Sequence, residues 1–244
     1  MLKPFLLALS LLTRFPVNQI DDFEASDSGK SALFYPLIGL IIGLVFYLPI
    51  LFFNEYSQIT IAAVVTVLGA IITGGLHLDG LADSADGWLG GIGDRDKTIK
   101  IMKDPVVGSA GVIAIVSVLL LKFAIYTNMF QSTFHGIFLA SGIIIIAPII
   151  SRAMILLLLL STEYIGDGMA KDISKYLPLR NAVLVVLFCM ILGFYFSAWG
   201  MLFALTGFWL LRRLMVRTLG GSTGDTIGAT VEITEVLFLL GSVF

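Results

Sequence analysis

The sequence has 244 residues, of which 58% are hydrophobic and only 13% are charged, about half the charged fraction of ordinary soluble domains. This composition excludes an ordinary soluble domain, and a formal net charge of −2 offers none of the basic surface that a nucleic-acid partner needs. The single cysteine, Cys189, excludes an internal disulfide and a multi-thiolate metal site.

The chain begins with an apolar run at 1–16 that Lys3, Arg14 and Pro16 interrupt. The run is too short to cross a bilayer, and it lacks the small-residue cleavage site that follows a signal peptide. We therefore expect a short interfacial helix at 1–16, followed by a polar linker at 17–30 whose acidic residues face solvent.

Apolar segments of about 20 residues follow, each long enough for a membrane-spanning helix. They are roughly 31–53, 58–76, 107–127, 136–160, 182–198 and 199–216. A shorter apolar end at 236–244 completes a seventh helix if that helix begins near Thr226. The sequence therefore predicts an all-α, polytopic integral membrane bundle of about six to seven transmembrane helices, which forms a single domain over 1–244.

Lysine and arginine gather in alternate loops, and cytoplasmic loops are the ones that collect these residues. With the N-terminus inside, the inner side carries Lys3, Arg14, Arg95, Lys97, Lys100, Lys103, Lys171, Lys175, Arg180, Arg212, Arg213 and Arg217. The outer loops NEYSQ, TNMFQST and SAWG contain none. This asymmetry predicts the cytoplasmic (inner) membrane, a break between the last two spans at SAWG instead of one long tilted helix, and a cytoplasmic position for 74–106 and 220–235.

The segment HLDGLADSADG at 77–87 concentrates carboxylates in a chain poor in charge. Asp79, Asp83 and Asp86 are four and three residues apart, so on a helix they share one face. A single acid at a membrane edge is commonly a helix cap or the partner of a lysine. Three stacked acids repel one another and need a cation, and ionisable groups at this depth are functional by default. We expect them to hold Mg²⁺.

A second acidic motif lies at 220–235, where Asp225, Glu232 and Glu235 are seven and three residues apart. We expect these side chains to complete the Mg²⁺ site from a second helix at the same end of the bundle. Mg²⁺ usually keeps several waters and takes one or two carboxylates together with substrate phosphate oxygens. The two motifs therefore predict a substrate that carries phosphate.

Further residues around the motifs are candidates for substrate binding and catalysis. Glycines let the backbone approach an anion, and basic side chains bind it, although the lysines after the first motif equally suit anionic lipid headgroups. The binding candidates are Gly75, Lys103, Gly221, Thr223 and Arg217.

His77 lies off the face of the acids, where it either accepts a proton from a substrate hydroxyl or caps the turn. Arg152 lies deep in an apolar segment, which predicts a carboxylate or phosphate partner. The catalytic candidates are His77, Asp83 and Arg152.

These residues fit metal-assisted chemistry on a diphosphate, with no nucleophilic serine or cysteine constellation. On the residues alone, a membrane alcohol phosphotransferase of the CDP-alcohol type and an aspartate-rich prenyltransferase both stay open, although the Asp-Gly-x-x-Ala-Arg element of the former is not complete here. The alternative from another class is a cation-coupled secondary transporter, whose acids would lie in broken helices near the midplane of the bilayer instead of at one edge.

Two long segments carry a family resemblance. GGLHLDGLADSADG followed by KIMKDPVVGSAGV, and RTLGGSTGDTIGATVEITE near the end, resemble the signature segments of the cobalamin synthase family, the adenosylcobinamide-GDP ribazoletransferases. FLLALSLLTRFPV and FYPLIGLIIG resemble the N-terminal pattern of that family, so the similarity covers essentially the whole chain.

The resemblance implies a reaction and its partners. It implies that adenosylcobinamide-GDP is joined to α-ribazole or its 5′-phosphate with Mg²⁺, giving adenosylcobalamin or its 5′-phosphate and GMP. The two acid sets fall on the two family motifs, and Asp104 falls in the family's segment of Ile, Met, a basic residue and Asp, so the resemblance makes Asp104 a further binding candidate. Pro105 and Val106 depart there from the expected serine and basic residue, which weakens phosphate binding by a side chain of this turn. The lipid bilayer is the other expected partner, and a homo-oligomer is left open.

Overall fold

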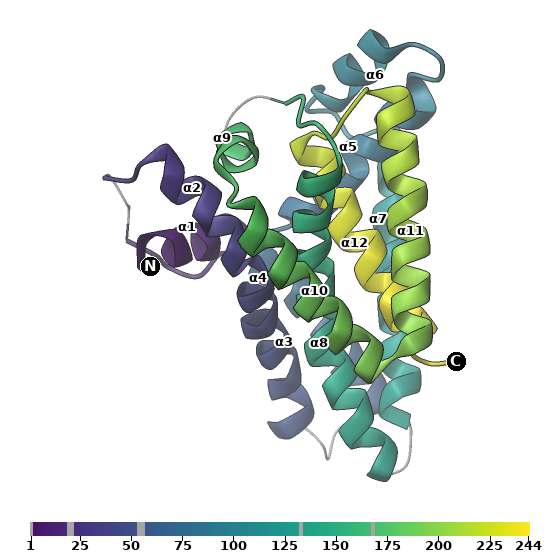
Figure 1. Ribbon diagram of the computed structural model, residues 1–244. Coiled ribbons are helices and arrows are strands. Elements are labelled where there is room, and N and C mark those ends of the chain that lie inside the picture. Colours follow the sequence, from purple (N-terminus) through teal and green to yellow (C-terminus); the bar gives the residue numbers. More distant parts are fainter. Residues whose placement is uncertain (1, 19–21, 53–56, 132–133, 167–168) are drawn as a thin grey trace.

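The computed structural model describes residues 2–18, 22–52, 57–131, 134–166 and 169–244, with the side chains of 131–141 left out. Along these residues the chain is helical, which confirms the predicted all-α class. The helices are α1 Leu2–Leu12, α2 Ala25–Ser31, α3 Tyr35–Phe52, α4 Gln58–Thr73, α5 Leu76–Gly90, α6 Arg95–Met102, α7 Ser109–Gln131, α8 Phe134–Ser161, α9 Met169–Tyr176, α10 Leu179–Phe196, α11 Ala198–Thr218 and α12 Gly224–Gly241 (Figure 1).

Several helices are long and apolar enough to cross a bilayer, so this is a multi-pass membrane protein. Within the described chain they are Ala25–Phe52, Ser109–Phe130, Gly142–Ser161, Leu179–Phe196 and Ala198–Thr218. The predicted span at 58–76 differs, because α4 ends at Thr73 and α5 leaves it at an angle of 87°. Gly74 and Gly75 make this bend with φ values of +62° and +73°, a left-handed conformation that glycine adopts without strain.

A helical hairpin joins the last two predicted spans, as the charge distribution indicated. Only Ser197 separates α10 from α11, and its hydroxyl accepts a hydrogen bond from the Gly200 amide at 2.9 Å, which caps the start of α11. The alternative of one long tilted helix is excluded. Cys189, on α10, is buried in the core and 2% exposed.

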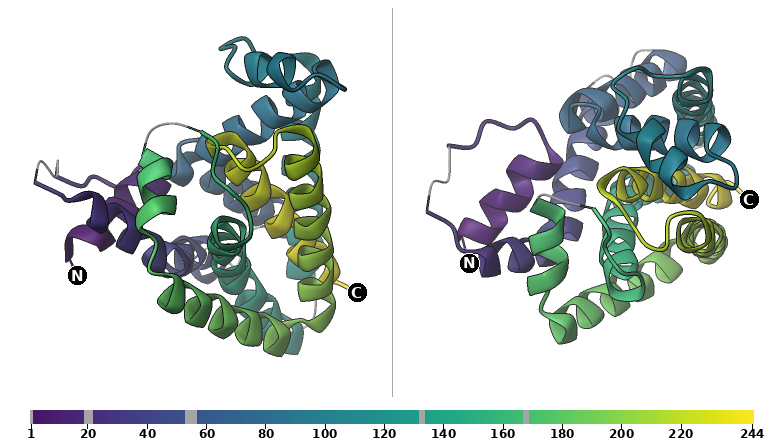
Figure 2. Two further views of the ribbon diagram at one scale, coloured as in Figure 1. Left: turned by 45° about the horizontal axis from the view of Figure 1, so that its top comes forward. Right: turned by 90° about the horizontal axis from the view of Figure 1, so that it is seen from above.

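The predicted seventh helix, α12, is a central helix of the bundle and not a lipid-facing one. It lies beside α5, α7, α8 and α11. In the view from above, α5 and α7 lie on one side of it, and α8 and α11 lie on the other (Figures 1 and 2). The other central helix is α8, in which 83% of an 18-residue stretch within Gly142–Ser161 is buried, against 22% of the residues of α10. Side chains that α12 presents are therefore enclosed by protein.

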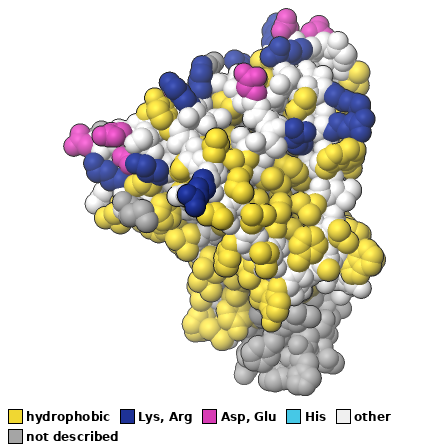
Figure 3. All heavy atoms as spheres, in the orientation of Figure 1, with side chains coloured by type: hydrophobic (Ala, Val, Ile, Leu, Met, Phe, Trp, Pro, Cys, Tyr) yellow, Lys and Arg dark blue, Asp and Glu magenta, His cyan; other side chains and the backbone are white. Residues whose placement is uncertain are grey.

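Charged and apolar side chains are separated along the bundle. Lysines, arginines and acids lie over the upper part of the visible face, at the α6 end and at the left over the N-terminal helices, whereas the described side chains below them are almost entirely hydrophobic (Figure 3). The same end holds α5 and the start of α12 (Figure 1). Both acidic motifs therefore begin at the polar end of the molecule.

Close contact between α3 and α8 depends on two glycines four residues apart. A methyl group on Gly43 would lie 2.5 Å from the Ile145 carbonyl oxygen, and one on Gly39 would lie 2.4 Å from the Pro148 carbonyl oxygen. Small residues at this spacing let membrane helices approach backbone to backbone. The contact matters for the site because Tyr35, at the start of α3, lines the cavity described below.

Gly43→Ala is expected to destabilise the protein by about 1–3 kcal/mol, because the added methyl group meets backbone that cannot rotate away. The measurement is the thermal unfolding midpoint in detergent micelles. Gly224→Ala is the matched control, since its methyl group would meet no atom closer than 3.9 Å. Equal midpoints for the two variants would contradict the assigned α3–α8 contact.

Candidate active site

The aspartates of the two motifs meet where α5 crosses α12. A methyl group on Gly80 would lie 2.7 Å from the Asp225 carbonyl oxygen, and one on Gly228 would lie 3.1 Å from the His77 carbonyl oxygen. These glycines let the two helices touch, and this contact brings Asp79 and Asp225 to one site. The charges of both repel the Asp83 carboxylate, which is half-buried beside them.

Negative charge at this site is only partly compensated. Burial raises the pKa of Asp225 above its ordinary value, and the charge of Asp79 raises it further, while the cation of Lys103 lowers it. Lys103 directly follows α6, as the residue that caps its C-terminal end, and is exposed. The charges of Asp79, Asp83, Asp225 and Lys103 thus act on one another, with a surplus of negative charge, and the role of the aspartates as metal ligands stays a prediction.

Asp86 has a different environment from the other two aspartates of α5. One of its oxygens accepts a hydrogen bond from the Gly108 amide at 2.7 Å, and the other accepts one from the Gly111 amide at 2.9 Å. Asp86 thereby caps the start of α7 and fixes the turn that follows α6. Asp104 stabilises that same turn, since its carboxylate accepts a hydrogen bond from the Val106 amide at 3.0 Å.

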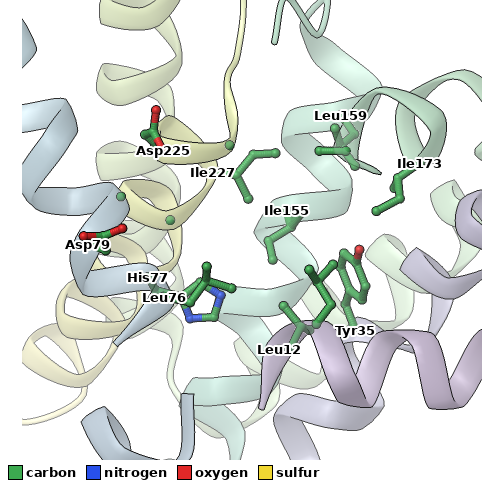
Figure 4. Close-up of a pocket in the computed structure, with 15 residues that line it drawn as sticks. Leu12, Tyr35, Leu76, His77, Asp79, Ile155, Leu159, Ile173, Asp225 and Ile227 are labelled. Atoms are coloured by element: carbon green, nitrogen blue, oxygen red, sulfur yellow. The ribbon is translucent and has the colours of Figure 1, made fainter. Parts of the chain in front are cut away.

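A cavity of about 200 Å³ opens beside the aspartates. Asp79 and Asp225 lie on one side of it, and Tyr35 and Ile173 lie on the opposite side (Figure 4). The wall between them is apolar and comes from α1, α3, α8, α9 and α12. Carboxylates therefore border a hydrophobic chamber at the polar end of the molecule.

His77 lines the same cavity (Figure 4). Its side chain is 2% exposed, and its Nδ1 atom has no hydrogen-bond partner among the described residues. A buried polar atom without a partner is costly, so such an atom commonly marks a place where a ligand or water binds. The predicted contact between His77 and a substrate stays a prediction, and the position of the imidazole is compatible with it.

Glu232 and Glu235 lie deeper along α12 and pair with cations. Lys122 Nζ contacts one oxygen of each glutamate at 2.8 Å, and Arg152 forms an ion pair with the other oxygen of Glu235. Ser151 donates a hydrogen bond to Glu235 at 2.9 Å. The predicted carboxylate partner of Arg152 is thus confirmed. The structure does not bring the two glutamates to the aspartates, so their role as metal ligands stays a prediction that these ion pairs disfavour.

Comparison with known proteins gives the chain its family. Residues 4–243 match the family model described as cobalamin-5-phosphate synthase. An adenosylcobinamide-GDP ribazoletransferase of Pseudomonas putida strain W619 is 41% identical over 243 residues, which cover 98% of this chain and 97% of that protein. Proteins of the same name in Pseudomonas fluorescens and Acinetobacter baumannii are 40% and 38% identical, again over 98% of this chain and over 98% and 96% of their own lengths. No solved structure was found to match.

The chain belongs to the cobalamin-5-phosphate synthase family. It is therefore an enzyme of cobalamin biosynthesis, which confirms the resemblance seen in its two long motifs. The secondary transporter and the other membrane transferases considered above are excluded as families.

Several predicted binding residues of this synthase have structural roles in the described chain. Gly75 begins α5 at the bend from α4. A methyl group on Gly221 would lie 2.3 Å from the Glu163 carbonyl oxygen, so this glycine lets the segment before α12 pack against 163–165. Thr223 caps α12 by accepting a hydrogen bond from the Thr226 amide. Arg217 is exposed in the last turn of α11. Phosphate binding by these residues stays a prediction.

Sequence reasoning missed Lys122 and the cavity wall of the synthase. The missed signal was a lone lysine within an apolar span, which requires a buried counter-charge. The segment at 161–181 contributes Ala170 and Ile173, both on α9, to the cavity. No local sequence pattern predicts such a cavity wall, because its residues come from helices far apart in the sequence.

The raised pKa of Asp225 predicts how stability depends on pH. A carboxyl whose pKa is higher in the folded state lowers stability as the pH rises between its unfolded and folded values. With a chelator present, Asp225→Asn is therefore expected to be more stable than the wild type at pH 7, and the difference should shrink toward pH ~4. Thermal midpoints across this range provide the measurement, and a difference that grows as the pH falls would contradict the assignment.

Proposed function

We propose that this enzyme joins adenosylcobinamide-GDP to α-ribazole or α-ribazole 5′-phosphate, releases GMP, and uses Mg²⁺ at a site that faces the cytoplasm. The names of its relatives supply the donor and the type of transfer. The observation that carries the proposal is that Asp79 and Asp225 border an apolar cavity, with the Asp83 carboxylate close enough for their charges to repel it. A hydroxyl-bearing acceptor and a diphosphate can both reach these carboxylates.

The proposed transfer is a displacement at phosphorus. A ribose hydroxyl of the acceptor loses its proton, and its oxygen forms a bond to the phosphorus atom that carries the corrinoid arm. The bond from that phosphorus to the bridging oxygen breaks, and GMP leaves with the electron pair. A carboxylate at the mouth of the cavity, or His77, is placed to take the proton. Lys103 lies where its cation can approach the leaving phosphate.

Mg²⁺ fits the donor set through Asp79, Asp83 and Asp225. The described residues contain no group of three or more acidic, histidine or cysteine side chains already arranged around one ion. A hard cation that takes one or two carboxylates and completes its shell with water and substrate phosphate does not need such a group. When bound, the ion neutralises charge on the transferred phosphoryl group. The mutual repulsion of the three aspartates is what such a cation relieves.

The cytoplasmic orientation is supported by the positions of the basic residues. Lysines and arginines lie over the upper part of the visible face, which includes the end that holds α5 and α6, and the described side chains below them are apolar (Figure 3). Positive charge is retained on the cytoplasmic side of membrane proteins. GMP, a soluble nucleotide, would then be released into the compartment where nucleotides are used.

Release of GMP by purified protein tests the proposal. Protein in detergent micelles, given adenosylcobinamide-GDP, α-ribazole and Mg²⁺, is expected to form one GMP for each corrinoid product. Omission of α-ribazole is the control, because GMP formed without it would indicate hydrolysis. Excess chelator is expected to stop the reaction and Mg²⁺ to restore it. Failure to release GMP with both substrates and Mg²⁺ present would refute the proposed function.

A further inference from the structure

We propose that the apolar cavity beside the aspartates binds the aromatic base of the acceptor nucleoside. The proposal rests on the proposed function and assigns a place to one of its two substrates. The expected ligand class is a bicyclic aromatic base that bears no polar substituents and has one free ring nitrogen, linked to a ribose. The donor diphosphate would then approach the aspartates from outside the cavity.

The lining of the cavity has the chemistry of a site for an apolar ring. Its side chains include Leu12, Tyr35, Ile155, Leu159, Ile173 and Ile227. Ile155, Tyr35 and Ile173 are each 2% exposed, so the wall is held by the packed core. Predominantly apolar walls with a few converging polar groups are typical of small-molecule sites. A hydrophobic surface of this kind favours an aromatic ring and penalises a polar one.

The size of the cavity decides which part of the substrates fits. Sites for whole drug-sized ligands span about 300–1,000 Å³, and this cavity has about 200 Å³. A single ring system fits this volume, whereas the corrin macrocycle of the donor does not. The donor's guanine is small enough, but its several donors and acceptors would lose their hydrogen bonds to water against an apolar wall. The base of α-ribazole carries a single acceptor, its free ring nitrogen.

The polar atoms of the cavity match the same ligand. His77 Nδ1 lacks a partner within the described chain, and the side chain is 2% exposed. One unpartnered imidazole nitrogen suits a base with one free ring nitrogen, because a single hydrogen bond satisfies both atoms. Asp79 and Asp225 lie on the side of the cavity opposite Tyr35 and Ile173 (Figure 4), where the ribose would lie if the base occupied the apolar part. A base held inside therefore directs a ribose hydroxyl toward the carboxylates.

Filling the cavity tests this assignment. Ile227→Trp, on α12, and Leu159→Trp, on α8, add bulk from two different walls. Each is expected to raise the KM for α-ribazole by at least about tenfold, while the KM for adenosylcobinamide-GDP stays within about twofold. Leu160→Trp is the matched control, since Leu160 is the next residue of α8, is half-buried and does not line the cavity. It should leave both constants near the wild-type values.

A second variant protects the test against loss of folding. Ile227→Ala enlarges the cavity, and it is expected to use a riboside whose base has one more fused ring, which the wild type should reject. Such a gain cannot come from a damaged fold. An unchanged KM for α-ribazole in both tryptophan variants, or a rise confined to the donor, would overturn the assignment while the proposed function stood.

Direct binding separates this inference from the proposed function. Equilibrium dialysis of α-ribazole against the wild-type protein and Ile227→Trp needs no turnover, so it gives a result even if no GMP forms. Weaker binding by the variant supports the cavity assignment. Equal binding by both proteins overturns it.

Discussion

Exchange of Asp225 for asparagine is expected to reduce GMP release by about 10²- to 10³-fold, the usual effect of removing one charge-stabilising group from an active site. The amide keeps the shape of the side chain but cannot neutralise a divalent cation. Burial and the charge of Asp79 already oppose ionisation of Asp225. Removal of the Asp225 charge therefore relieves repulsion instead of breaking a favourable contact. Activity should therefore fall while folding is preserved.

Two other aspartates supply the controls for this exchange. Asp96→Asn should leave activity and stability near wild type, because Asp96 is exposed on α6. Asp86→Asn should lower the thermal midpoint, since Asp86 accepts hydrogen bonds from the Gly108 and Gly111 amides. The measurements are GMP release and the unfolding midpoint for each variant. An active Asp225→Asn protein would remove Asp225 from the proposed metal set.

Lys122→Met is expected to cost about 3–5 kcal/mol of stability, because it leaves two buried carboxylates with a single cation. Lys122 is 8% exposed and lies 2.8 Å from both Glu232 and Glu235. The change removes one of two positive charges from a cluster whose formal charges otherwise cancel, since Arg152 is the second cation. The measurement is thermal unfolding in detergent micelles.

A compensating double variant distinguishes lost charge balance from lost packing. Lys122→Met combined with Glu232→Gln should recover much of the lost stability, since Arg152 then still neutralises Glu235. Lys97→Met is the control, because Lys97 is exposed on α6 and such changes usually stay within about 0.5 kcal/mol. If the double variant were less stable than Lys122→Met alone, the cluster would not owe its stability to balanced charge.

The helices and their order could be predicted from hydrophobic segments and loop charges, because both are properties of short stretches of sequence. Each apolar run of about 20 residues became a helix within a few residues of its expected bounds, and the loop at SAWG became a turn at Ser197. Two features of the fold differ from the predicted one because of local backbone conformation and helix packing. Gly74 and Gly75 end the expected span at Thr73 and turn the chain by 87° into α5, and the end of the chain became a buried central helix. Neither depends on hydrophobicity alone.

The aspartates show how far spacing along the chain predicts a site. Intervals of four and three residues place Asp79, Asp83 and Asp86 on related turns of α5, but the amides of α7 bind Asp86. An interval of seven likewise relates Asp225 to Glu232, although Glu232 lies where Lys122 reaches it. Helical period predicts which residues share a face, whereas the neighbouring helix determines what that face meets.

The sequence by itself determined the all-helical membrane class, the positions of the helices and the family, because hydrophobic length, loop charge and long motifs are properties of consecutive residues. Only the tertiary structure decided which acids share a site, which are paired with Lys122 and Arg152, and where an apolar cavity opens beside Asp79 and Asp225. The physical reason is that each of these features needs side chains from helices far apart in the chain, and their meeting depends on close contacts such as that of Gly80 with α12.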